Sequence, residues 1–133
     1  MVRLAQAGKT RFRVGIIATS MTIGTGLYQN ALHRRLGDTA EVVTPDERAQ
    51  LVFQDAIRSA KAGDRSEGLI ASTLAEAEAL VSPPGGAPCD VLLLGCTEMP
   101  LLLNEARFKS APIVDPLRLL ATEIVAFTRL HAA

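Results

Sequence analysis

A candidate for chemistry is Cys96, which follows a short apolar stretch and a glycine. Residues 91–94 are aliphatic and lie between turn-forming residues, a pattern typical of a strand in a parallel sheet covered on both faces. In open parallel α/β sheets, ligands bind just beyond the carboxyl ends of the strands. The sequence therefore predicts that Cys96 lies at a ligand-binding edge, where its thiolate can serve as a base or a nucleophile.

Two local effects act on the pKa of Cys96 in opposite directions. We predict a helical turn over residues 98–105, and the amino end of a helix lowers the pKa of a nearby thiol. An ionised Glu98 close by raises that pKa. The local sequence leaves the sum open, and a buried, inert cysteine is the alternative interpretation.

Two further segments carry groups that suit an anionic ligand. Residues 19–26 are rich in hydroxyls and glycine and lead into a helix, so their backbone N–H groups can bind an anion. The alternative is that Thr22 or Thr25 simply caps this helix. Lys61 falls in the last turn of a helix predicted over 46–61, where the common role of a lysine is to oppose the helix dipole.

The elements that position these groups follow from the apolar periodicity. Strands are predicted at residues 13–18, 40–43, 91–94 and 112–115. Helices are predicted from the 19–26 turn to about residue 36, over 46–61 and 65–81, and from 116 to about 130. Strands that alternate with helices predict an α/β fold, a three-layer sandwich in which a four-stranded parallel sheet is flanked by helices.

Helix boundaries are marked by capping residues. The expected N-caps are Thr44, Asp64 and Asp115, with Pro45 and Pro116 at first helical positions and with Glu47 and Glu67 completing capping boxes. Gly63 is the expected left-handed residue after the 46–61 helix. The last helix carries an apolar stripe of Leu120, Ile124, Phe127 and His131.

Length and composition indicate a single domain, predicted at residues 13–131 after a lead-in at 1–12. The 14 basic residues balance 14 acidic ones, so no charge field favours nucleic acid or an anionic membrane. The apolar runs fall short of the roughly 18 residues that a membrane span needs. Cys89 and Cys96 are predicted at opposite ends of one strand and therefore as free thiols, which indicates a reducing, cytoplasmic location.

Three segments together resemble one enzyme family. The sequence LGCTEMPLL at residues 94–102 closely resembles the second active-site motif of the cofactor-independent aspartate/glutamate racemases. Residues 14–32 are similar to the strand, turn and helix that open the second half of these proteins, and residues 43–63 match the segment that follows. Glu98 stands where glutamate racemases have a histidine, which resembles the aspartate-racemase side of the family. The resemblance implies a flavodoxin-like half of an Asp/Glu racemase, the C-terminal one.

The resemblance implies a 1,1-proton transfer at the α-carbon of aspartate or glutamate, with no pyridoxal phosphate or other cofactor and no metal. Two cysteines flank this carbon in the family, one removing a proton as thiolate and the other delivering one as thiol to the opposite face. By the same resemblance, Cys96 is the second of these cysteines and Glu98 assists its proton exchange. Thr22 and Thr97 would then bind the substrate carboxylates, and Lys61 would pair with the distal carboxylate.

The chain departs from the family pattern because it lacks the Cys-Asn-Thr motif of the first half. Family members have two similar halves in one longer chain, and residues 4–10 resemble the tail of the helix that joins those halves. Cys89 is followed by Asp90 and enters a strand instead of leaving one, so it does not replace the missing cysteine. The expected partner is therefore a second copy, which gives a homodimer, or a complementary first half.

Two alternatives to a racemase stay open at the level of sequence. One is a catalytically silent, half-length relative that binds a small dicarboxylate, and the missing cysteine motif motivates it. The other is a decarboxylase or isomerase of small diacids, because relatives in the wider superfamily perform such reactions with a single cysteine.

Overall fold

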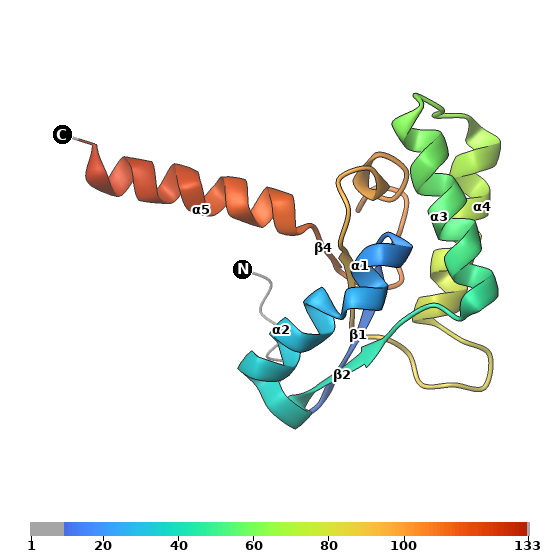
Figure 1. Cartoon of the computed structure of the whole chain (residues 1–133), viewed down its shortest axis with the longest axis horizontal. Helices are drawn as coiled ribbons and strands as arrows, with labels where there is room; N and C mark the ends of the chain where they lie inside the picture. The colour runs from blue at the N-terminus through green and yellow to red at the C-terminus, as the bar shows by residue number, and fades with distance from the viewer. Residues whose placement is uncertain (1–9, 133) are drawn as a thin grey trace.

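The fold is built on a parallel sheet with helices on both faces (Figure 1). The computed structural model describes residues 10–132. Within them, the strands are β1 (Phe12–Ile17), β2 (Ala40–Val43), β3 (Val91–Leu94) and β4 (Ile113–Val114), in the order β2-β1-β3-β4 and all parallel. The predicted α/β fold with a four-stranded parallel sheet is confirmed. Most of the predicted lead-in, residues 1–9, lies outside the described residues.

The helices fall into two pairs and one helix that stands apart. They are α1 (Ser20–Thr25), α2 (Leu27–Leu36), α3 (Glu47–Lys61), α4 (Glu67–Val81) and α5 (Pro116–His131), with 3₁₀ turns η1 (Gly37–Thr39) and η2 (Met99–Leu101). Figure 1 shows α3 and α4 side by side on one side of the sheet, with α1 and α2 on the other. Among the described residues, no helix is both long and apolar enough to cross a membrane.

The two faces of the sheet form two apolar clusters. Successive strand residues point to opposite faces, so Leu92 and Leu94 of β3 join the cluster under α3 and α4, while Val91 joins the cluster under α1 and α2. Phe53 of α3 is fully buried against the first face. Both faces of β3 are therefore covered, which is why its sequence reads as a continuous apolar run.

Only the first turns of helix α5 lie beside the rest of the described molecule. In Figure 1 it projects away from the sheet, and none of its described residues is buried. Its predicted N-cap is confirmed, because the Asp115 side chain accepts hydrogen bonds from the backbone N–H groups of Leu117 and Arg118, with Pro116 at the first helical position. The predicted stripe thus lies on a helix face that no described residue covers.

Two of the predicted N-caps are wrong. The cap of α3 is Asp46, which accepts from the N–H of Ala49 at 2.8 Å. A cap at Thr44 would start the helix immediately after β2, with no residues in which the chain can turn. The cap of α4 is Ser66, because Asp64 instead accepts from the N–H of Ser66 at 2.8 Å and shapes the turn.

The remaining boundary predictions had mixed outcomes. Gly63 follows α3 with φ of 97°, the predicted left-handed conformation. The helix predicted to reach residue 36 is two helices, broken at Gly26 with φ of 71°, and its cap is Thr19 instead of Thr22 or Thr25. The helical turn predicted over 98–105 is only the 3₁₀ turn η2.

Candidate active site

Strand β3 ends at Leu94, and Cys96 follows it after Gly95. Strands β1 and β3 pair with Ile17 opposite Leu94, and the N–H of Gly95 donates to the carbonyl oxygen of Ile17 at 2.8 Å. The turns after β1 and β3 therefore leave the sheet side by side. Cys96 is half-buried, and its Sγ accepts a hydrogen bond from the N–H of Met99 at 3.4 Å. The predicted position of Cys96 at the carboxyl edge of the sheet is confirmed.

The surroundings of Cys96 raise the pKa of its thiol above the ordinary value. Burial is the main cause, and the negative charges of Glu98 and Asp115 act in the same direction. The backbone N–H groups of Met99 and Glu98 oppose this shift, but they belong to a single 3₁₀ turn and not to a helix with a strong dipole. Of the two effects that the local sequence leaves open, burial and negative charge outweigh the N–H donors, so the pKa of the thiol is raised.

Glu98 and Lys61 come together across the fold. The Nζ of Lys61, at the end of α3, lies 3.7 Å from the Oε1 of Glu98. The Glu98 side chain is 17% exposed and that of Lys61 is 72% exposed. Because ion pairs with such an exposed partner contribute only about 0–1 kcal/mol to stability, the lysine is available to a ligand at little cost to the fold.

The two threonines are placed differently. Thr97 lies between Cys96 and Glu98 and is exposed. Thr22 lies on α1, and among the described residues its hydroxyl pairs with that of Thr19 at 2.9 Å, not with another predicted site residue. Cys96, Thr97, Glu98 and Lys61 therefore form one cluster, while Thr22 lies apart from it on α1.

Tyr28 is a member of the site to which sequence reasoning gave no role. Its ring packs over Gly95, so closely that a Cβ at position 95 would lie 2.6 Å from the Cε2 of Tyr28 and 3.1 Å from the Cβ of Ala18. Burial raises the pKa of Tyr28, and electrostatic repulsion from Cys96 in its thiolate form and from Asp115 raises it further. The signal that could have located a close neighbour is the glycine itself at the end of a buried strand.

Asp115 was predicted only as a helix cap, yet it also belongs to the site. It follows β4 directly, so it leaves the sheet at the same edge as Cys96. Its negative charge raises the pKa of Cys96 and of Tyr28. This role was predictable in principle, because the carboxyl ends of parallel strands share one edge of a sheet.

Two glutamines of α3 hold the turn beside the site. The Nε2 of Gln50 donates to the carbonyl oxygen of Ala18 at 2.9 Å. The Oε1 of Gln54 accepts from the N–H of Ser20 at 2.8 Å. These bonds fasten α1 and the end of β1 to α3, so they fix the wall of the site next to Gly95.

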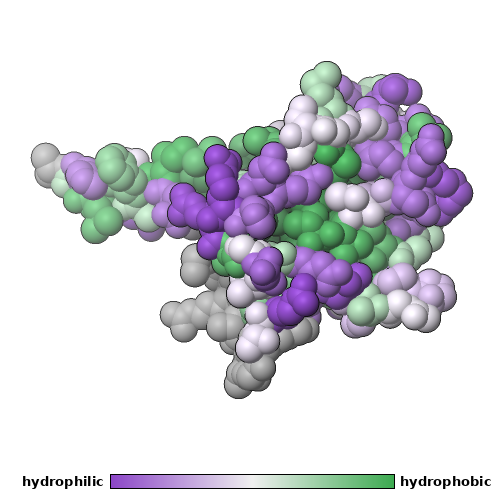
Figure 2. Space-filling view, turned by 60° about the horizontal axis from the view of Figure 1, so that its bottom comes forward, coloured by the Kyte–Doolittle hydropathy of each residue, from purple (hydrophilic) through white to green (hydrophobic). Residues whose placement is uncertain are grey.

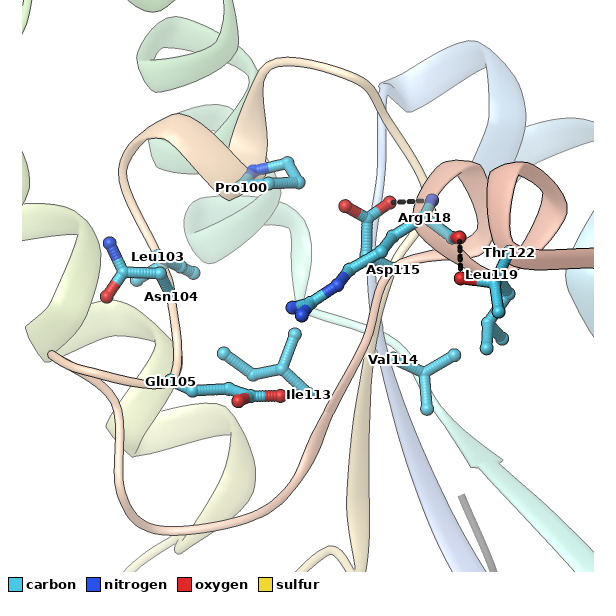
Figure 3. Close-up of a pocket in the computed structure, with 10 residues that line it drawn as sticks. All are labelled: Pro100, Leu103, Asn104, Glu105, Ile113, Val114, Asp115, Arg118, Leu119 and Thr122. Carbon is cyan, nitrogen blue, oxygen red and sulfur yellow. Dashed lines mark hydrogen bonds between the residues drawn. The ribbon is translucent and has the colours of Figure 1, made fainter. Parts of the chain in front are cut away.

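A cavity of about 250 Å³ adjoins this cluster, between η2, β4 and the first turns of α5. Figure 3 shows the Arg118 side chain reaching from α5 into the cavity, with Glu105 across from it and Pro100 at its rim. None of the five predicted site residues lines it. Of the residues assigned to the site above, Asp115 lines this cavity and Cys96 does not. Among the described residues, no group of three or more His, Cys, Asp or Glu side chains is placed to hold a metal ion.

The chain is similar to known proteins along most of its length. The family model described as Asp/Glu/Hydantoin racemase matches residues 1–124. An uncharacterized protein in the pnlA 3' region of Pectobacterium carotovorum subsp. carotovorum is 33% identical over 97 residues, which cover 70% of this chain and 57% of that protein. The chain therefore spans less than two thirds of the length of this relative.

Solved structures share the fold. An Asp/Glu racemase homologue from Yersinia pestis superposes with a TM-score of 0.69 at 22% identity, and an aspartate racemase homologue from Pyrococcus horikoshii OT3 with a TM-score of 0.70 at 18% identity. In each case the match covers 88% of this chain and 48% of the other chain. This chain thus corresponds to about half of each of these structures.

Proposed function

The chain belongs to the Asp/Glu/hydantoin racemase family, and on this premise we propose that it catalyses a cofactor-independent 1,1-proton transfer at the α-carbon of aspartate or glutamate. The observation that supports the proposal is the half-buried Cys96 thiol at the carboxyl edge of the sheet, with Glu98 paired to Lys61 beside it. Glu98 follows the Cys-Thr pair, and we take it as the reason to favour aspartate over glutamate.

The proposed reaction needs two cysteines, one on each side of the α-carbon. The thiolate of one takes the α-proton, and the Sγ–H of the other gives its proton to the opposite face, so the first becomes a thiol and the second a thiolate. A single monoprotic base would return the proton to the face from which it came. Cys96 can take either role in this pair, and Glu98 is assigned the exchange of a proton between Cys96 and solvent.

The charges around Cys96 suit an acidic amino acid. We assign the ammonium of Lys61 to the distal carboxylate of the substrate, because its side chain is exposed and its partner Glu98 is less so. The hydroxyls of Thr97 and Thr22 are assigned to the substrate carboxylates. In this arrangement the substrate carboxylate competes with Glu98 for Lys61, which frees Glu98 to act on Cys96.

The second cysteine is proposed to come from a second copy of the chain. Within the described residues the other cysteine, Cys89, is buried at the opposite end of β3, so it does not reach the site from within the same copy. A homodimer with two-fold symmetry would bring one Cys96 from each copy. We propose a cytoplasmic location, because Cys89 and Cys96 are both free thiols.

The test is proton NMR of L-aspartate and L-glutamate in deuterated buffer with the purified protein, combined with chiral analysis. Loss of the α-proton signal with appearance of the D-enantiomer is the expected result. Cys96→Ser should abolish both, whereas the matched variant Cys89→Ser removes the other thiol and should retain them. Equal activity of the Cys96→Ser variant and the unaltered protein would contradict the proposal.

One observation favours a second candidate function. Each copy offers one thiol whose pKa is raised, and a single proton donor suffices to protonate the carbanion that decarboxylation of a small diacid leaves. Incubation with malonate- and maleate-type diacids, followed by NMR, tests this function. Turnover of a diacid together with an absence of α-proton exchange in amino acids would favour it over racemisation.

A further inference from the structure

Helix α5 presents an apolar surface that the described part of the chain leaves uncovered. Seven large apolar side chains of this helix are 36 to 82% exposed: Leu117, Leu119, Leu120, Ile124, Val125, Phe127 and Leu130. Figure 2 shows the corresponding apolar surface along the projecting helix. Monomeric soluble proteins rarely expose a continuous apolar patch of more than a few hundred Å². We therefore expect another polypeptide segment to cover this surface.

The spacing of the exposed residues indicates what kind of element covers them. The positions Leu117, Leu120, Ile124, Phe127 and His131 follow one another at intervals of three, four, three and four residues. This spacing is the a and d pattern of a heptad, whose apolar seam packs against a second helix that lies nearly parallel or antiparallel to it. The ring of His131 stacks on Phe127 with centroids 4.1 Å apart and extends the seam to the end of the helix.

We propose that the partner is a second copy of this chain and that the two copies dock through their α5 helices. A heptad seam is self-complementary, because identical a and d positions interlock across a two-fold axis. The positions that flank the seam are Ala121, Glu123, Thr128 and Leu130, and only Glu123 carries a charge. The chain as a whole has a formal net charge of zero, so two copies do not repel each other.

The seam is open to a partner. Its four apolar residues, Leu117, Leu120, Ile124 and Phe127, are 55 to 63% exposed, so more than half of each side chain is available for contact. The solved relatives contain about as much chain again as the part that matches this one, since the match covers 48% of their length. A second copy supplies that amount of protein and carries the same apolar seam on its own α5.

Docking through α5 places the second copy beside the candidate site. The helix starts at Asp115, whose charge acts on Cys96, so its first turn lies at the carboxyl edge of the sheet. The proposal deepens the proposed function by naming the surface that recruits the second copy. The test measures the mass of the protein and not its activity, so the docking proposal and the proposed function can fail separately. A dimer without α-proton exchange would refute the proposed function and would still support docking through α5.

The test compares two lysine substitutions on α5 by sedimentation equilibrium at tens of micromolar. The unaltered protein should have twice the 14.1 kDa mass of one chain. Ile124→Lys places a charge in the seam and should raise the dissociation constant of the dimer by roughly 100-fold or more. Ala126→Lys is the matched control on the opposite side of the helix and should remain a dimer. A monomeric unaltered protein, or an Ile124→Lys variant that still dimerises, would overturn the proposal.

A second measurement needs no variant. Amide hydrogen exchange of α5 in the unaltered protein should slow by about tenfold or more as the concentration rises through the dissociation constant, because pairing protects the helix. The amides of β1 and β3 should exchange at a rate that does not depend on concentration. Exchange of α5 that is equally fast at every concentration would show that the helix has no second copy against it, even if a different polypeptide covers it elsewhere.

Discussion

The contact between Gly95 and Tyr28 allows a sharp test of how the site is built. In Gly95→Ala, the new Cβ would meet the Cε2 of Tyr28 at 2.6 Å on one side and the Cβ of Ala18 at 3.1 Å on the other. The first distance is shorter than any real contact of a Cβ atom, and Ala18 is fixed by the end of β1. The tyrosine ring must therefore move, together with the turn that carries Cys96.

The expected cost follows from two opposing effects. Overpacking of this kind destabilises a protein by about 1–3 kcal/mol. The backbone at Gly95 is not left-handed, so alanine there also lowers the entropy of the unfolded chain, which stabilises by about 0.4–1 kcal/mol. The net loss in the free energy of unfolding is about 1–2 kcal/mol, with a fall in the melting temperature of roughly 4 °C per kcal/mol.

Urea denaturation followed by circular dichroism measures this loss, with Gly68→Ala as the matched control. Gly68 lies in α4, and a Cβ added there would have no heavy atom within 4 Å, so alanine should stabilise the protein by up to about 1 kcal/mol. In a Tyr28→Ala background the 2.6 Å contact is removed and only the 3.1 Å contact with Ala18 remains, so Gly95→Ala should cost clearly less. A Gly95→Ala variant as stable as the unaltered protein, or an equal cost with and without the tyrosine ring, would refute the packing argument.

Three further predictions follow from the same geometry. Alkylation of Cys96 by iodoacetamide should rise with pH through a midpoint above that of a cysteine peptide, because burial raises the thiol pKa, and Asp115→Asn should lower that midpoint by removing a negative charge. Lys61→Met should raise the KM for L-aspartate roughly tenfold or more while changing the free energy of unfolding by less than about 1 kcal/mol, and Lys109→Met, on another exposed lysine, should change neither. Ser66→Ala should cost about 1 kcal/mol in urea denaturation, because it removes the N-cap of α4; no loss would show that Asp64 caps the helix after all.

The sequence predicted the sheet better than the helix ends, for physical reasons. Strands β2 and β3 have the predicted bounds, since a buried strand is marked by its apolar run and by the turn residues around it. Neighbouring cap candidates such as Thr44 and Asp46 have nearly equal intrinsic preference. The choice between them depends on how many residues the chain needs to turn after a strand, and the pattern of residue types does not contain that number.

In the site, too, the sequence predicted the positions that follow from neighbouring residues and missed those that depend on tertiary packing. The shared position of Cys96, Thr97 and Glu98 was predictable because they follow one strand, and the parallel order of the strands brings Asp115 to the same edge. The ring of Tyr28 over Gly95 depends on how α2 crosses the sheet, and residue spacing does not specify that crossing. Only the family resemblance pointed to Lys61 as a neighbour of this cluster, because no local pattern brings the end of α3 to Glu98.

The single cysteine of the site and the uncovered face of α5 both indicate a need for a second copy of the chain. One substitution tests whether racemisation depends on dimerisation. If a second copy docks through α5 and supplies the second thiol, Ile124→Lys should lose racemisation in proportion to its loss of dimer, although Ile124 is exposed on α5 and lies outside the catalytic cluster. Cys96 in the monomeric variant should keep its alkylation profile, because the burial that raises its pKa comes from its own copy. Chiral analysis of L-aspartate at a series of protein concentrations measures the first effect, with Ala126→Lys as the control. Racemisation at full rate by a monomeric Ile124→Lys variant would show that one copy holds a complete site and that the second thiol has another source.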